Sequence, residues 1–397
     1  MDFRFTEEQE ALRREFDSFF KEVMKEAPED WEGGLEAFLA TDEGWAFHRR
    51  VQRKLAEKGW LTLAWPKEYG GQALSIIEQM IFSEVRGYHR APGIDIWGLD
   101  MLAPTLMIYG TEEQKKEHLP LMAEAEIHWC QLWSEPNAGS DLAALTTRAV
   151  EDGDDYVLNG QKIWATGAHR ADAAFTLART NPNEPRHRGI SYFLLDLKTP
   201  GVTIRPIPDM AGNATFNEVF LDDVRIPKRN MVGEKDRGWY VTLATMNFER
   251  SGAGGIAEAM RTIEELVQFA KETKNDGRAL WDDPFVRHRL AQLAIEVRVG
   301  RAMAYRIAWM QHKGELAASE ASAIKVYRSE LGQRIVYTGC QIMGLYGQVK
   351  KSRWAPLMGR FVREYQNCVG DNIAAGSSEI QRNIIATRGL ELPREPR

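Results

Sequence analysis

The sequence predicts an α+β multidomain protein in which two helical regions flank a β-rich middle. Helix-start signals and apolar residues at helical spacing fill the first 120 or so residues, and period-two alternation with turn residues runs from about 125 to 232. Alanine-rich helical patterns return after Gly238. We therefore expect an all-α domain over residues 1–124, an antiparallel β-barrel or sandwich over 125–232 and a four-helix bundle over 233–397.

Two capping boxes define helix starts in the N-terminal region. Thr6 is followed three residues later by Gln9, and Thr111 by Gln114. A threonine at the N-cap and a glutamine at N3 can each bond to the other's backbone N–H, which fixes the first turn. The second helix should end near Pro120.

Short strands with turn residues between them characterise the middle region. Residues 174–178, 190–195, 202–204 and 218–221 read as strands. Asn159-Gly160, flanked by residues 156–158 and 162–164, predicts a two-residue hairpin turn. In the C-terminal region, residues 240–272, 284–312 and 316–345 predict long helices of a bundle.

Composition excludes several classes of function. The 397 residues carry a net charge of −6 without a basic stripe, which argues against a nucleic-acid partner. Apolar runs are too short to span a membrane, and the acidic N-terminus lacks a secretory pattern, so we expect a cytoplasmic protein. The three cysteines are scattered and the histidines lack ligand spacing, so no metal site is expected.

Two segments in the middle region carry recognisable chemistry. Residues 131–141 (Gln-Leu-Trp-Ser-Glu-Pro-Asn-Ala-Gly-Ser-Asp) form a Pro/Gly-rich loop after a strand, which can expose backbone N–H groups and hydroxyls to a ring edge or to phosphate oxygens. Residues 162–166 (Lys-Ile-Trp-Ala-Thr) place a tryptophan and a threonine close together. The alternative interpretation of the first segment is a polar turn between strands. Taken alone, the second would be interpreted as a hairpin strand with a core tryptophan.

Together with later segments at 246–250, 341–347 and 374–382, these residues resemble the acyl-CoA dehydrogenase family across nearly the whole chain. The resemblance implies bound FAD, an acyl-CoA substrate, an electron-transferring flavoprotein as electron acceptor, and a homotetramer or heterotetramer. It implies that the flavin pyrimidine edge meets Gln131, Leu132, Trp133 and Ser134, and that Ser140 reaches the pyrophosphate and the CoA arm. Trp164 would cover the flavin, with the Thr166 hydroxyl near its N5.

The later segments add residues to the implied sites. Asn247 and Arg250 would contact the substrate, although the family usually has aspartate in place of Asn247. Gln341 and Gly344 would meet the FAD of a neighbouring subunit, and Ser377 and Glu379 belong to the C-terminal cofactor segment.

The catalytic base is assigned by a departure from the usual pattern. Many members of the family use a glutamate at the position that Ala375 occupies here, and alanine cannot take a proton. A few, isovaleryl-CoA dehydrogenase among them, carry the glutamate directly before the arginine, which is Glu249 in this chain. A carboxylate in a low-polarity pocket suits removal of a weakly acidic α proton. The alternative is an ordinary helix glutamate paired with a cation.

The expected reaction is therefore α,β-dehydrogenation of an acyl-CoA thioester. Two alternatives stay open: a flavin-dependent monooxygenase or desulfinase on the same fold, and a non-catalytic subunit of a heteromeric acyl-CoA dehydrogenase. The second is compatible with the absence of the family's Arg-x-x-Phe-Gly run, where this chain has residues 273–277 (Thr-Lys-Asn-Asp-Gly).

Overall fold

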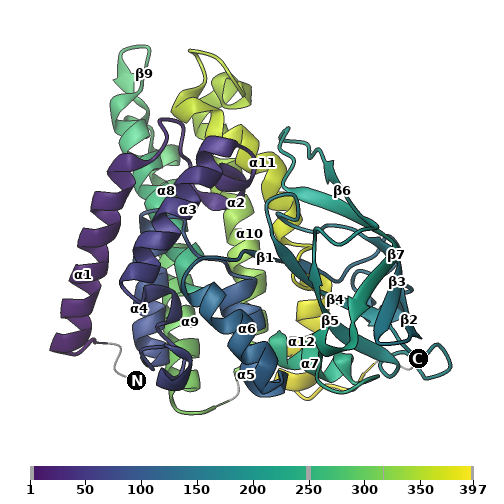
Figure 1. Ribbon diagram of the computed structural model, residues 1–397. Coiled ribbons are helices and arrows are strands. Elements are labelled where there is room, and N and C mark those ends of the chain that lie inside the picture. The colour runs from purple at the N-terminus through teal and green to yellow at the C-terminus, as the bar shows by residue number, and fades with distance from the viewer. Residues whose placement is uncertain (1–3, 247–251, 316, 395–397) are drawn as a thin grey trace. The chain divides into compact units, whose positions relative to one another are not determined.

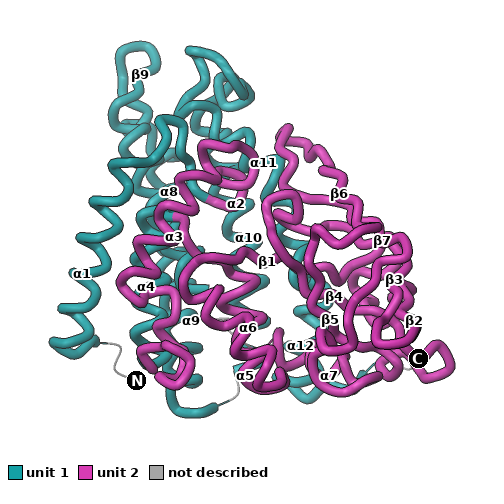
Figure 2. The backbone as a smooth tube through the Cα atoms, in the orientation of Figure 1, with its two compact units in different colours: residues 1–33, 74–91, 250–397 teal, residues 34–73, 92–249 magenta. Residues whose placement is uncertain are grey.

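The chain forms two compact units that interleave along the sequence. A computed structural model describes residues 4–246, 252–315 and 317–394. Unit 1 comprises residues 1–33, 74–91 and 250–397, and unit 2 comprises residues 34–73 and 92–249 (Figure 2). The three-domain order expected from the sequence (helical, β, helical) is confirmed, whereas the boundaries at residues 124 and 232 stay predictions.

Unit 1 consists mainly of long helices. They are α1 (Glu7–Val23), α4 (Ile76–Tyr88), α8 (Ala253–Glu272), α9 (Pro284–His312), α10 (Ala318–Met343), α11 (Arg360–Asp371) and α12 (Ser378–Ile384), with a small hairpin of β9 (Lys274–Asn275) and β10 (Arg278–Ala279). Leu266, Leu290, Leu331 and Phe361 lie in its core, each at most 1% exposed. The bundle forms because each helix buries one apolar stripe against the others.

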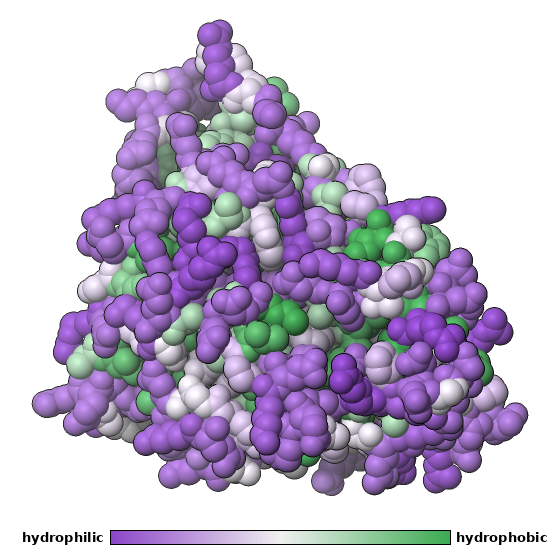
Figure 3. Space-filling model, in the orientation of Figure 1, coloured by the Kyte–Doolittle hydropathy of each residue, from purple (hydrophilic) through white to green (hydrophobic). Residues whose placement is uncertain are grey.

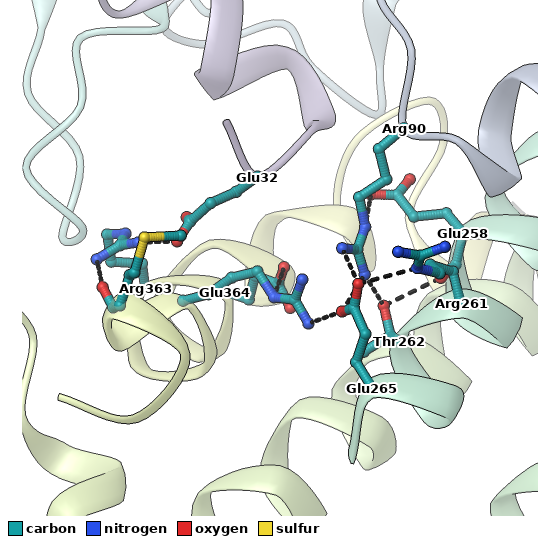
Figure 4. Close-up of polar contacts among 10 residues, drawn as sticks. Glu32, Arg90, Glu258, Arg261, Thr262, Glu265, Arg363 and Glu364 are labelled. Carbon is teal, nitrogen blue, oxygen red and sulfur yellow. Dashed lines mark hydrogen bonds and ion pairs between the residues drawn. The ribbon is translucent and has the colours of Figure 1, made fainter. Parts of the chain in front are cut away.

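A network of charged side chains joins helices within unit 1 (Figure 4). At its centre Glu265 of α8 accepts two hydrogen bonds from Arg90, each of 2.9 Å, one of 3.1 Å from Arg261 and one of 2.7 Å from Arg360. Burial by itself would raise the pKa of Glu265, but the bonds from Arg90 and the charges of Arg360 and Arg90 outweigh it and lower the pKa to about 2. The carboxylate is therefore ionised at neutral pH and shared among three cations.

The helices of unit 2 lie before and after its sheet in the sequence. They are α2 (Gly34–Leu39), α3 (Asp42–Glu57), α5 (Ala103–Tyr109), α6 (Glu112–Ala123) and α7 (Gly238–Thr245). The capping boxes at Thr6 and Thr111 open α1 and α6, as predicted, with both reciprocal bonds present. Pro120 lies inside α6, which ends three residues later than expected.

Eight strands of unit 2 form one sheet (Figure 1). They are β1 (Trp129–Leu132), β2 (Arg148–Asp152), β3 (Asp155–Lys162), β4 (Ala173–Arg179), β5 (Ile190–Asp196), β6 (Val202–Ile207), β7 (Phe216–Pro227) and β8 (Met231–Val232). Their order is β6-β7-β3-β2-β4-β5-β8, with β1 paired to β4. Most pairs are antiparallel as expected, but two strands run parallel to β4: β1, with Trp129 opposite Ala173 and Leu132 opposite Thr176, and β2, with Arg148 opposite Arg179.

The hairpin predicted at Asn159-Gly160 is wrong. Both residues lie inside β3, which continues to Lys162, and the register against β7 shifts between Leu158 and Gly160. A Cβ on Gly160 would lie 2.4 Å from Thr147 Oγ1, so glycine is required here by a close approach and not by a turn. The turn between β2 and β3 is at residues 153–154, where Gly153 has φ of 60°.

The helix predicted over residues 240–272 is in two pieces. Helix α7 ends at Thr245, and α8 begins after Gly252, whose φ of 70° is incompatible with a continuous helix. The helices predicted over 284–312 and 316–345 correspond to α9 and α10.

The surface is mixed in polarity. On the face drawn in Figure 3, hydrophilic residues predominate and hydrophobic ones form separate small patches. Among the described residues, no helix combines the length and apolarity that a membrane crossing requires.

Candidate active site

One edge of strand β1 has no neighbouring strand among the described residues, although the Trp129 N–H at its start donates to the Asp95 carboxylate at 2.9 Å. Its only strand partner in the described part of the chain is β4, so the backbone groups of its other edge are not used in the sheet. Leu132 and Trp133 are buried, whereas Gln131 and Ser134 are half-buried. The indole N–H of Trp133 is buried and has no hydrogen-bond partner among the described residues. An unpaired strand edge and an unused donor side by side fit a ligand with polar edge atoms.

The loop after β1 is tied down at both ends. Glu135 and Ala138 exchange two backbone hydrogen bonds of 3.0 Å, which closes a tight turn. Asp141 pairs with Arg186 at 2.9 Å. Ser140 between them is exposed. Its hydroxyl is therefore accessible on a loop of fixed conformation.

Trp164 adopts a backbone conformation that is unusual for a bulky residue. Its φ is 60°, and its side chain is 57% exposed with its ring at 6.0 Å from Phe216, edge to face. The next residue is clamped by buried Asn217: Ala165 N–H donates to the Asn217 carbonyl at 3.0 Å, and the Asn217 amide donates to the Ala165 carbonyl at 2.8 Å. Such strain persists only where the surroundings enforce it and is concentrated at functional sites. Thr166, half-buried, follows directly.

Three hydrogen bonds join the two segments. Lys162 Nζ donates to the carbonyl of Trp133 at 3.2 Å and to the carboxylate of Glu135 at 2.9 Å. Between them, Ile163 N–H donates to the carbonyl of Ser134 at 2.9 Å. These bonds hold residues 131–135 and 162–166 side by side, and we call the two segments together the ledge. The structure brings together Gln131, Leu132, Trp133, Ser134, Trp164 and Thr166, all of them predicted site residues.

The Glu135–Lys162 pair is buried within the sheet. Lys162 is 0% exposed and Glu135 is 6% exposed. Burial alone would raise the pKa of Glu135, but the charge of Lys162 and hydrogen bonds from Thr147 and Thr146 lower it to about 2. Burial lowers the pKa of Lys162, and the charge and hydrogen bond of Glu135 oppose that shift.

Sequence reasoning missed both members of this pair. The available signal was periodicity: Tyr156, Leu158 and Lys162 are an even number of residues apart on one strand, and the first two are core residues. A lysine on that face must be buried and requires an acidic partner. Glu135 lies in the neighbouring motif but not in the set of predicted contacts.

The remaining predicted cofactor residues belong to unit 1. Gln341 is near the end of α10, and Gly344 follows it with φ of 59°. Ser377 caps α12 by accepting a hydrogen bond from Ile380 N–H at 3.3 Å, and Glu379 is in the first turn of that helix. Helix α12 packs against α10.

The predicted base and substrate residues Asn247, Glu249 and Arg250 lie outside the described residues. The position that would carry the usual base, Ala375, has φ of 53°, and its carbonyl accepts a hydrogen bond from the Gln381 amide at 2.9 Å. No group of three or more histidine, cysteine, aspartate or glutamate side chains in the described part of the chain could hold a metal ion.

Comparison with known proteins identifies relatives along the whole chain. Family models for the N-terminal, middle and C-terminal domains of acyl-CoA dehydrogenases match residues 6–126, 130–224 and 236–390. The chain is 35% identical over 401 residues to acyl-CoA dehydrogenase FadE26 of Mycobacterium tuberculosis, covering 99% of both chains.

Solved structures agree with the sequence relatives. A structure described as the Tcur3481-Tcur3483 steroid ACAD superimposes with a TM-score of 0.89 at 32% identity and covers 100% of both chains. The ChsE4-ChsE5 complex from Mycobacterium tuberculosis gives a TM-score of 0.87 at 35% identity, covering 99% of this chain and 100% of that one.

Proposed function

Because the chain belongs to the acyl-CoA dehydrogenase family of flavoprotein oxidoreductases, we propose that it binds FAD and dehydrogenates an acyl-CoA thioester between its α and β carbons. The observation that carries the proposal is the ledge, since three hydrogen bonds join the two segments that the family uses at the flavin. Bound FAD supplies the acceptor for the hydride that leaves the β carbon.

The residues of the ledge fit a flavin ring. The unpaired edge of β1 and the unused indole N–H of Trp133 offer hydrogen bonds to the polar pyrimidine edge. Trp164, exposed and held at positive φ, offers a flat apolar face that would exclude water from the ring. Ser140 offers a hydroxyl to the phosphates or to the CoA arm.

Glu249 is the proposed base. It precedes Arg250, and Ala375 at the alternative position has no proton-accepting group. The Glu249 carboxylate would take the α proton as the β hydride leaves, and Arg250 and Asn247 would contact the substrate. Electrons would then pass to an electron-transferring flavoprotein.

A steroid-type CoA thioester is the substrate class we propose first, because a relative that matches over the full length is described as a steroid ACAD. We also propose that the chain assembles with further chains, as two of the matching structures contain two named proteins. Phe285, Ile295 and Val299 support this, since they lie within one sector of α9 and are 79%, 57% and 45% exposed.

Anaerobic reduction of the bound flavin tests the reaction. Acyl-CoA esters with steroid, straight, branched and dicarboxylic acyl groups are mixed with the protein, and loss of flavin absorbance is followed by stopped flow. Glu249→Gln should slow this loss by about 10²–10⁴-fold while FAD stays bound, because a general base contributes that much. Glu272→Gln, at the exposed end of α8, is the matched control and should react like the parent.

Three outcomes would contradict parts of the proposal. Equal rates for Glu249→Gln and the parent would exclude Glu249 as base. Oxygen consumption with reduced flavin would favour a monooxygenase. If the protein binds FAD but no ester reduces it, either in the chain alone or in a complex purified with its partner chains, a non-catalytic subunit would be favoured.

A further inference from the structure

The buried Glu135–Lys162 pair donates a hydrogen bond to one backbone peptide group, that between Trp133 and Ser134. The Glu135 carboxylate accepts four hydrogen bonds: from Thr146 N–H at 2.6 Å, the Thr146 hydroxyl at 2.8 Å, Thr147 N–H at 2.9 Å and Lys162 Nζ at 2.9 Å. Three residues therefore hold the carboxylate in one orientation. Lys162, held by it, donates its further bond to the carbonyl of Trp133 at 3.2 Å.

Stability alone is a poor reason for this arrangement. Moving two charges out of water costs several kcal/mol per ion, about as much as their attraction returns, and well-packed apolar residues often do equally well. The core around them is apolar, with Leu132, Leu158 and Val219 each 0% exposed. What an apolar pair could not supply is a directional donor to the Trp133 carbonyl.

The bond to that carbonyl fixes a peptide plane. In a trans peptide the C=O of one residue and the N–H of the next point in opposite directions, and the described part of the chain contains no cis peptide bond. With the Trp133 carbonyl directed at buried Lys162, the Ser134 N–H is directed to the opposite side of the strand. The Ser134 carbonyl is fixed in turn by Ile163 N–H at 2.9 Å.

We propose that Lys162, held by Glu135, is a positioning residue for the flavin: it orients the Trp133–Ser134 peptide so that the Ser134 N–H is presented to the ring edge. The inference rests on the proposed FAD binding by the ledge and adds two residues that do not themselves touch the cofactor. The charge pair thus determines the direction of the Ser134 N–H in addition to contributing to the stability of the sheet.

Lys162→Met tests this, because methionine keeps most of the length and apolar bulk of the side chain and removes the donor. FAD-free protein is titrated with FAD, and the dissociation constant is measured together with the visible circular dichroism of the bound flavin, which depends on ring orientation. We expect the dissociation constant to rise at least tenfold and the dichroic bands to change. The thermal unfolding of the FAD-free protein is measured in parallel.

The matched control is Gln161→Met. Gln161 is the adjacent residue of β3, and its amide donates to Glu218 at 3.0 Å, so this variant also loses one bond to a glutamate. Its side chain projects to the opposite face of the strand. Its FAD affinity and dichroism should equal those of the parent.

The outcomes separate the inference from the proposed function. A parent protein that binds no FAD would overturn the proposed function and this inference with it. A parent that binds FAD and a Lys162→Met variant with unchanged affinity and dichroism, even at lowered thermal stability, would overturn the inference alone. If Lys162→Met does not fold, the double variant Glu135→Gln/Lys162→Met, which also lacks the lysine donor but leaves no unpaired buried charge, should shift both readouts in the same direction, and unchanged values would again refute the inference.

Discussion

Two charge clusters in this molecule, one buried and one partly exposed, are built in different ways. In unit 2, Glu135 and Lys162 form a closed pair in which one cation meets one carboxylate. In unit 1, Glu265 is shared among Arg90, Arg261 and Arg360, and Arg360 also approaches Glu364 at 3.3 Å (Figure 4). Both clusters lower the pKa of their central glutamate to about 2.

The two clusters should therefore respond differently when one of their side chains is replaced. Among the described residues the closed pair has no second ion-pair partner, so loss of one member leaves a buried charge without a counter-charge. A branched network keeps partners after losing one, and the Glu265 side chain is 24% exposed, so water can also reach it. Replacing one residue of the closed pair should therefore lower the free energy of unfolding strongly, and replacing one residue of the branched network should lower it only slightly.

The largest effect should follow from removing the acid of the closed pair. Glu135→Gln leaves the Lys162 ammonium buried without a carboxylate, and we expect a loss of about 3–5 kcal/mol in the free energy of unfolding. Urea denaturation measures it. Adding Lys162→Met should recover most of this loss, since no unpaired charge remains. A double variant as unstable as Glu135→Gln would mean that hydrogen bonds to Thr146 and Thr147 dominate, and not the charge.

Acid should act on both clusters in the same direction. Glu135 and Glu265 have pKa values of about 2 in the fold, against an ordinary glutamate value of 4.5. A lowered folded-state pKa stabilises the fold above pH 4.5, and this contribution of about 3 kcal/mol per group is lost as pH falls toward 2. In urea titrations from about pH 7 to about pH 2.5, the difference between the parent and Glu265→Gln should shrink with falling pH. A constant difference would contradict the lowered pKa.

The smallest effect should come from removing one arginine of the branched network. Arg90→Met leaves Glu265 with Arg261 and Arg360, so we expect a loss of only about 1–2 kcal/mol in the free energy of unfolding. Arg225→Met, which removes an exposed pair with Asp152 and Asp155, is the control and should leave the urea midpoint unchanged. If Arg90→Met destabilised as strongly as Glu135→Gln, the distinction between closed and branched clusters would be wrong.

Features that depend on local sequence could be predicted. The capping boxes at Thr6 and Thr111 are correct because both partners lie within one helical turn. The strand and helix order is correct because apolar periodicity is a local signal over several residues.

Features that depend on distant neighbours could not be predicted. Asn159-Gly160 has the composition of a turn, yet the glycine is required by contact with Thr147 across the sheet. Lys162 lies in a segment that resembles a family motif, but its ion-pair partner Glu135 lies in the loop after β1, 27 residues away in the sequence. Periodicity places Lys162 on the core face, and only the fold identifies its partner.

The parallel pairing of β1 with β4 has a consequence for the order of folding. Trp129 pairs with Ala173, and the intervening chain includes β2 and β3. During synthesis from the N-terminus, β1 must wait for all of these residues before its hydrogen-bonded partner exists, and such non-local pairing is slow. In nascent chains that end before Ala173, β1 has no strand partner on either edge. Because β1 supplies residues 131 and 132 of the ledge, we expect the ledge to become ordered only after β4 has been translated.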